Sequence, residues 1–274
     1  MSVSPGFLRF WRALDALLAE VRETRWGAVV TDGRFPALWD ANYARVDTPP
    51  PSLTAVDVER ELLPALARAA TDTMHVVSFH PDRTTRLLTE LSSRGHRLGW
   101  DVVMELRTAP EPGTSSVVEL PPGDDLWSRV QESLGLFGTS SPDATAQLRR
   151  LEQEVLAPGG KRWFGVSSED GRIASLAALL VLEGVAYVDN VATFPEARGR
   201  GLATAVTSHL AREGLAAGAS EVCLLADPDA PDAIRLYRRL GFRETGRLAS
   251  TRGPIPALEP PGRSSPQKIA ENTR

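Results

Sequence analysis

The stretch "VATFPEARGRGLATAV", residues 191–206, joins a predicted strand to a predicted helix through a tight basic turn. Within the turn, two neighbouring arginines repel each other, and two glycines raise the entropy cost of ordering the chain. A helix that starts near Gly201 leaves its first backbone N–H groups without partners inside the helix. These donors and the positive end of the helix dipole suit a pyrophosphate, which would offset both costs. An ordinary strand-to-helix turn with solvated arginines is the alternative that the turn alone leaves open.

The segments around this turn favour a mixed sheet. Residues 161–194 read as three strands separated by the turns Glu169-Asp170-Gly171 and Glu183-Gly184, which are typical of hairpins. After the turn come a helix to about Leu215, the strand "EVCLLAD", a helix through Tyr237 and the strand "GFRETGRLAS". A dinucleotide-binding unit is less favoured, because the turn lacks the GxGxxG spacing and hairpins precede it.

This order of elements resembles the GNAT superfamily of N-acetyltransferases over about residues 115–250. The acetyl-CoA loop of that family has Gln or Arg, two residues, Gly, one residue, then Gly or Ala, and Arg198, Gly201 and Ala203 match it. A later family segment has leucine and tyrosine followed by Gly-Phe, which here is "LYRRLGF", residues 236–242.

The resemblance implies an α+β GNAT fold, with a central mixed, mostly antiparallel twisted sheet flanked by helices. It also implies acetyl-CoA as acetyl donor and a primary amine of a small molecule or peptide as acceptor. The strand before the loop is expected to pair with the pantetheine arm. The expected cofactor-binding residues are Val191, Ala192, Thr193, Arg198, Gly199, Arg200, Gly201, Leu202, Ala203 and Thr204.

Two residues are candidates for catalysis. By resemblance, Tyr237 matches the family tyrosine that faces the CoA sulfur and donates a proton to the leaving thiolate; the alternative is a packing tyrosine at a helix end. Asp189 is the candidate base, because a carboxylate on an apolar strand is costly unless it is used or paired. Strand alternation predicts that Asp189 shares a face with Tyr187, Val191 and Thr193. A structural hydrogen bond to a neighbouring loop is the alternative for Asp189.

The sequence departs from the family at one position near the cofactor. Many members have an asparagine three residues before the alanine that precedes "LY", and this chain has Ala230 there. That contact is either absent or replaced by Asp229 or Asp232.

The first part of the chain predicts a second, smaller α/β domain. "TAPEPGTSS", residues 108–116, is rich in Pro, Gly, Ser and Thr, and we expect it to separate domains at 1–110 and 115–250. An amphipathic helix is expected at the start, with apolar residues from Phe7 to Val21 at helical spacing. Residues 87–106 resemble residues 233–250. Two explanations stay open: a diverged GNAT-like copy, or a chance likeness between two helix-Gly-strand units. No basic glycine-rich loop occurs in this part, so it is not expected to bind acetyl-CoA. Residues 251–274 are expected to form a flexible tail.

Composition narrows the classes of function. Of 274 residues, 42% are hydrophobic and 24% charged, and the net charge is −4, so neither nucleic acid nor an anionic membrane is an expected partner. One cysteine, Cys223, and four scattered histidines predict no disulfide within the chain and no metal site. We expect a cytoplasmic monomer or homodimer. Trp163 is a further candidate, as a wall of the acceptor pocket. The competing hypotheses are a non-catalytic acyl-CoA-binding regulatory protein and a structural tandem domain without an active site.

Overall fold

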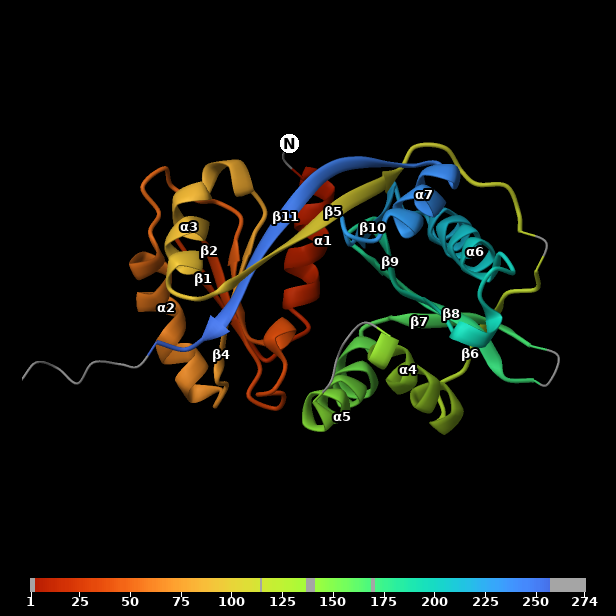
Figure 1. Ribbon diagram of the computed structural model, residues 1–274, viewed down its shortest axis with the longest axis horizontal. Coiled ribbons are helices and arrows are strands. Elements are labelled where there is room, and N and C mark those ends of the chain that lie inside the picture. The colour runs from red at the N-terminus through yellow and green to blue at the C-terminus, as the bar shows by residue number, and fades with distance from the viewer. Residues whose placement is uncertain (1–2, 114, 137–140, 169–170, 257–274) are drawn as a thin grey trace, which may run out of the picture.

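The structure is a computed structural model that describes residues 3–113, 115–136, 141–168 and 171–256. Its strands form one eleven-stranded mixed sheet in the order β1-β2-β3-β4-β11-β5-β10-β9-β8-β7-β6. Helices cover both faces of the sheet, which confirms the predicted fold class (Figure 1). The hairpin turn at residues 169–170 and the tail at 257–274 lie outside the described residues.

The second half of the chain holds the predicted motifs. Its elements are β6 (Val118–Leu120), α4 (Asp124–Leu136), α5 (Pro142–Leu151), the π-helix η3 (Glu152–Leu156), β7 (Arg162–Ser167), β8 (Ile173–Leu182), β9 (Val185–Thr193), the 3-10 turn η4 (Pro195–Ala197), α6 (Leu202–Ala216), β10 (Glu221–Ala226), α7 (Pro231–Arg239) and β11 (Phe242–Pro254). Glu183 and Gly184 both have positive φ, of 50° and 73°, and close the β8–β9 hairpin as their sequence predicts.

The first half repeats this order with fewer helices. It comprises α1 (Pro5–Asp15), β1 (Glu20–Thr24), β2 (Gly27–Thr31), the 3-10 turn η1 (Trp39–Ala41), β3 (Tyr43–Val46), α2 (Ala55–Arg68), β4 (Thr73–Ser78), the 3-10 turn η2 (Pro81–Arg83), α3 (Thr85–Ser93) and β5 (Arg97–Leu106). In each half, antiparallel pairs precede a parallel pair across a helix. Two such pairs, β1–β2 and β2–β3, precede β3–β4 across α2, and three, β6–β7, β7–β8 and β8–β9, precede β9–β10 across α6.

The two halves exchange their last strands. Strand β5 of the first half lies between β10 and β11, and β11 of the second half continues past β5 to pair with β4 (Figure 1). These two long strands carry one hydrogen-bonded sheet from one half into the other. A domain boundary near residues 108–116 therefore remains a proposal. The strands of the two proposed domains alternate within one sheet.

Packing also joins the halves. On one face, α6 and α7 cover a core that includes Val188, Leu210 and Phe242. On the other face, α1 packs Phe7 and Phe10 against strands of both halves, and Phe10 lies 5.1 Å from the ring of Tyr187. Further along that face, α4 covers a cluster of its own that contains Trp127 and Phe194.

Two expected boundaries are wrong. The opening helix ends at Asp15, and Val21 lies in β1, where it pairs with Val30. The tail does not start at residue 251: Thr251–Pro254 continue β11, opposite Val76 to Thr73. This pairing satisfies backbone groups along β4 that would otherwise form an open sheet edge.

Candidate active site

The parallel strands β9 and β10 separate in the middle of the sheet. Their pairing covers Val185 to Tyr187 of β9 and ends opposite Cys223. Beyond this point β10 pairs with β5 on its other side, and β9 continues to Thr193 against β8 alone. Within the described ranges, no strand thus pairs with the edge of β9 that faces β10 over residues 188–193. An extended chain with its own amide groups fits such an edge, as in strand addition to a sheet.

The basic turn follows directly at the end of β9. Arg198 donates from Nε to the backbone oxygen of Thr193 at 3.2 Å, which ties the turn to the strand. Gly199 and Gly201 both have φ of 76°, the left-handed region that favours glycine, and a Cβ on either would meet open space. Glycine is therefore present for its backbone conformation and leaves the space above the turn free.

Helix α6 begins with amide groups that have no partner among the described residues. Its first internal hydrogen bond runs from the Ala205 amide to the Gly201 oxygen at 3.1 Å, so the amides of residues 202–204 precede the helical ladder. Gly201 is the N-cap and provides no side-chain cap. Leu202 is buried and can offer only its backbone, whereas Ala203 and Thr204 are half-buried. These donors, Arg198 and Arg200 make the end of α6 a suitable site for a phosphate group.

A β-bulge corrects the predicted face of Asp189. Asp189 lies opposite Ala178 and Ala192 opposite Leu176, so Asn190 and Val191 together face a single residue of β8. Asn190 has φ of 51°, as expected at an irregular position. Because the extra residue resets the alternation, Asp189 shares its face with Ala192, and not with Val191 and Thr193.

Asp189 is part of a buried ionic cluster. Lys161 Nζ donates to Asp189 Oδ2 at 2.8 Å and to Glu152 Oε1 at 2.7 Å. The side chains of Lys161 and Glu152 are 3% and 6% exposed, and that of Asp189 is 30% exposed. Burial alone would lower the pKa of Lys161, but the two carboxylates outweigh it and hold that pKa above its usual value. The cluster thus contains one fixed positive charge and two carboxylates.

Sequence reasoning missed Glu152 and Lys161. Glu152 opens the π-helix η3, a rare local distortion that is frequent at functional sites. Burial raises its pKa, with Lys161 opposing the rise, and its Oε2 atom has no hydrogen-bond partner in the described part of the chain. Trp163 is buried, and its ring centroid lies 5.2 Å from Lys161 Nζ, so the ring packs against the cluster. The one available signal was Lys161 itself, directly before a buried strand.

Tyr237 lies near this cluster. It is buried in α7, and its ring is 6.2 Å from that of Phe242. Burial raises the pKa of Tyr237 to about 12, and the charge of Asp189 adds to the rise. The hydroxyl is therefore protonated at neutral pH and can donate a hydrogen bond. Ala230, where many family members have asparagine, is the N-cap of α7 and offers no side-chain hydrogen bond.

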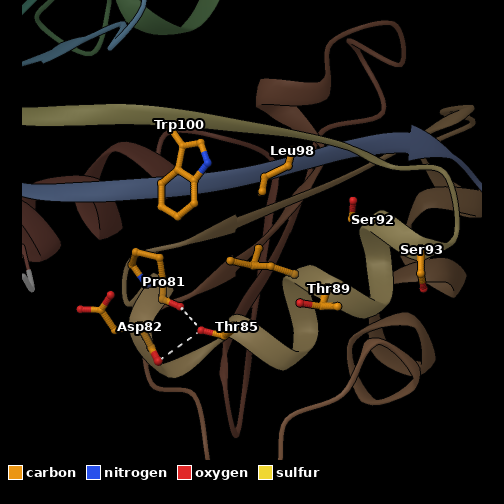
Figure 2. A pocket seen from close by; sticks show the side chains of 9 residues that line it. Pro81, Asp82, Thr85, Thr89, Ser92, Ser93, Leu98 and Trp100 are labelled. Carbon is orange, nitrogen blue, oxygen red and sulfur yellow. Dashed lines mark hydrogen bonds between the residues drawn. The ribbon is translucent and has the colours of Figure 1, made fainter.

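Two pockets differ in their relation to this site. One, of about 370 Å³, borders the basic turn, and Ala197, Arg200, Arg129 and Arg172 are among its lining residues. The other, of about 510 Å³, lies between α3 and β5 of the first half, where Leu98 and Trp100 project over Thr85 and Thr89 (Figure 2). The larger pocket is remote from the basic turn, so volume alone does not identify the site. Within the described ranges, no group of His, Cys, Asp and Glu side chains is arranged to hold a metal ion.

Comparison with known proteins agrees with this geometry. Residues 127–242 match the model of the Acetyltransferase (GNAT) family, and this part of the chain is a GNAT acetyltransferase domain. The chain is 32% identical over 142 residues to a mycothiol acetyltransferase of Nocardia farcinica. The matched region covers 50% of this chain and 45% of that protein. The chain thus matches about half the length of this curated relative.

Solved structures extend the likeness to both halves. A GCN5-related N-acetyltransferase from Kribbella flavida has a TM-score of 0.59 at 15% identity and covers 90% of this chain and 93% of its own. A functionally unknown conserved protein from Staphylococcus epidermidis has a TM-score of 0.65 at 12% identity, over 86% of this chain and 94% of its own. At these identities the likeness shows the fold, and the fold includes the first half.

Proposed function

We propose that this protein transfers the acetyl group of acetyl-CoA to a primary amine of a small molecule or peptide. The observation that carries the proposal is the separation of β9 from β10 directly before an uncapped, glycine-started helix. In the described part of the chain, none of the helices has the length and apolar character needed to cross a membrane.

The donor would bind along the unpaired edge of β9. The pantetheine arm has two amide groups that can pair with backbone groups of residues 191–193 as an added strand would. The pyrophosphate would accept hydrogen bonds from the amides that begin α6, with Arg198 and Arg200 adding positive charge. The arginine-lined pocket beside Arg200 is suited to further phosphate oxygens of the same molecule. Most of the rate gain would come from holding thioester and amine together.

Two proton transfers complete the reaction. The nitrogen of the acceptor must lose protons, and the sulfur that leaves as the C–S bond breaks must gain one. Tyr237 is suited to the second task because its hydroxyl stays protonated and lies near Asp189. Asp189 is the residue that the sequence offers for the first task, and its ion pair with Lys161 bears directly on that role.

Measurement of CoA thiol release across a panel of amines tests the proposal. The panel includes the acceptor of the Nocardia mycothiol acetyltransferase, since that protein is the relative matched at 32% identity. Transfer to at least one amine, with an acetylated product found by mass spectrometry, is the expected result. Calorimetric binding of acetyl-CoA without turnover on any amine would support the alternative, a non-catalytic acyl-CoA-binding regulatory protein. Absence of binding would support a structural tandem domain.

A further inference from the structure

The base of the proposed reaction need not come from the GNAT domain. Asp189 is held by Lys161 at 2.8 Å and accepts from the Asn190 amide at 2.9 Å, so both its oxygens already have donors. The ion pair and the amide hydrogen bond hold this carboxylate in place within the cluster. A carboxylate that is open to solvent and has no fixed partner is better suited to exchange protons with an acceptor amine.

A loop of the first half lies against the GNAT domain. Phe35, Leu38 and Ala41 form one buried cluster with Leu151 and Val155, which belong to α5 and η3. At the same contact, the amide of Ala37 donates to Gln147 Oε1 at 2.8 Å. This packing fixes the loop and the 3-10 turn η1, which carries Asp40, against the helix that supplies Glu152 to the ionic cluster.

Asp40 meets both requirements. Its side chain is exposed, and in the described part of the chain it forms no hydrogen bond or ion pair. The negative charges of Asp189 and Asp101 raise the pKa of Asp40. The charges of all three carboxylates also raise the pKa of Tyr187. Asp40 is thus an accessible carboxylate from the first half that lies within electrostatic range of Asp189 on the open strand of the second half.

We propose that Asp40 is the general base that accepts a proton from the acceptor ammonium, in a step that rests on the function proposed above. One N–H proton of the ammonium passes to the Asp40 carboxylate and then to solvent. The neutral nitrogen attacks the thioester carbonyl carbon, an N–C bond forms and the C–S bond breaks. Sulfur takes the Tyr237 proton, and the nitrogen loses a second proton through water that restores Tyr237. One proton is released for each acetyl group transferred.

The surroundings of Asp40 tune it for this task. Although water reaches the carboxylate, the protein around it displaces enough solvent to raise the pKa of Asp40 to about 7; Asp189 and Asp101 add to the rise, and Arg252 of β11 opposes it. On β4, burial lowers the pKa of His75 to about 3, so this neighbour of Trp39 is uncharged at neutral pH. A base is most effective when its pKa lies near the working pH.

The test is the pH dependence of kcat/KM with the best amine of the panel. Below about pH 7, Asp40 is protonated and cannot accept, so the wild-type rate should fall with an apparent pKa near 7. Asp40→Asn should lower the rate roughly 10²–10⁴-fold and remove this limb without changing acetyl-CoA affinity. Asp40→Glu should recover part of the rate, and the control Asp72→Asn, an exposed carboxylate of the same half, should behave as wild type.

Neighbouring charges give a readout that a structural role would not move. Asp101→Asn removes a charge that raises the pKa of Asp40, so the limb should move to lower pH by roughly 0.3–1 unit. Arg252→Gln should move it to higher pH by a similar amount. Carbon-13 titration of the protein without substrates should show a carboxyl group with a pKa near 7 that is missing in Asp40→Asn.

The outcomes separate the two proposals. An active wild type whose rate and acid limb are unchanged in Asp40→Asn would overturn the role of Asp40 alone. A wild type that binds acetyl-CoA and acetylates no amine would overturn the proposed function, and the base role with it.

Discussion

The same strand–turn–helix unit occurs twice, and only one copy is open. In the second half, β9 leaves its parallel partner and ends at a helix with uncapped amides. In the first half, β3 stays paired with β4 to its end, where the Phe79 amide donates to the Val46 oxygen at 3.0 Å. Strand β3 thus has β2 on one side and β4 on the other, and the described structure offers no edge beside it for an added chain.

The helices that follow differ in the same way. Thr54 and Asp57 cap α2 reciprocally, and the Ala55 amide donates to Glu90 Oε2 at 2.8 Å. The Glu90 carboxylate and the Thr54 hydroxyl therefore accept from amides of the first turn of α2, whose counterparts in α6 have no such partner in the described part of the chain. Helix N-termini of the same topology are thus either filled internally or left open for a ligand, and the capping residues decide which.

Each half also contains a buried cation between carboxylates. In the first half, Arg45 binds Asp15 and Asp47 at the end of β3, where the strands are closed. In the second half, Lys161 binds Glu152 and Asp189 beside the open strand. The two halves thus hold corresponding ionic clusters, one beside closed strands and one beside the open strand.

Loss of Lys161 should have the largest effect on the open half. Lys161→Met leaves two carboxylates without their cation and should lower the free energy of unfolding by about 3–5 kcal/mol. The control Arg150→Met breaks an exposed pair with Glu154 and should leave the free energy of unfolding close to the wild-type value. Urea denaturation at pH 7 measures both. Equal losses in the two variants would show that the buried cluster does not support the open strand.

Tyr237→Phe tests whether the open half carries the chemistry. It should lower kcat roughly 10–10³-fold and leave acetyl-CoA affinity nearly intact, because the hydroxyl matters most when charge develops on sulfur. Pre-steady-state kinetics establishes which step limits the rate. If the variant turns over at the wild-type rate with chemistry limiting, Tyr237 is a packing residue.

Arg198→Ala tests the basic turn itself. Loss of a charge-assisted contact should weaken acetyl-CoA binding by about 1–3 kcal/mol in calorimetry. Arg25→Ala is the matched control, since Arg25 pairs with Asp57 in the first turn of α2. Equal affinities in the two variants would argue against a phosphate at the turn.

The smallest effect is expected at the closed turn. Thr54→Ala removes the N-cap of α2 and should lower the free energy of unfolding by about 0.5–2 kcal/mol. Because this cap holds no ligand, acetyl-CoA affinity should stay at the wild-type value. A change in affinity without a change in stability would mean that α2 takes part in donor binding.

The sequence predicted the elements that local chemistry determines. The glycine conformations at 199 and 201, the β8–β9 turn and the helix that starts at Leu202 follow from residue type and spacing. It could not predict features that depend on distant strands. The bulge at Asn190 reversed the expected face of Val191, and the exchange of β5 and β11 turned part of an expected tail into a strand. Lys161, Glu152 and Asp40 reach the site only through tertiary packing.

Titration calorimetry with acetyl-CoA tests the central claim, that only the open copy binds the donor. The wild type should bind one equivalent per chain, and Gly201→Glu should bind at least about tenfold more weakly, since it places a carboxylate at the start of α6. Gly95→Glu is the matched control. Gly95 also has positive φ, of 88°, and open space around it, so this substitution imposes similar backbone strain in the first half. Its affinity should equal that of the wild type. Two equivalents per chain, or wild-type affinity in a folded Gly201→Glu protein, would contradict the claim.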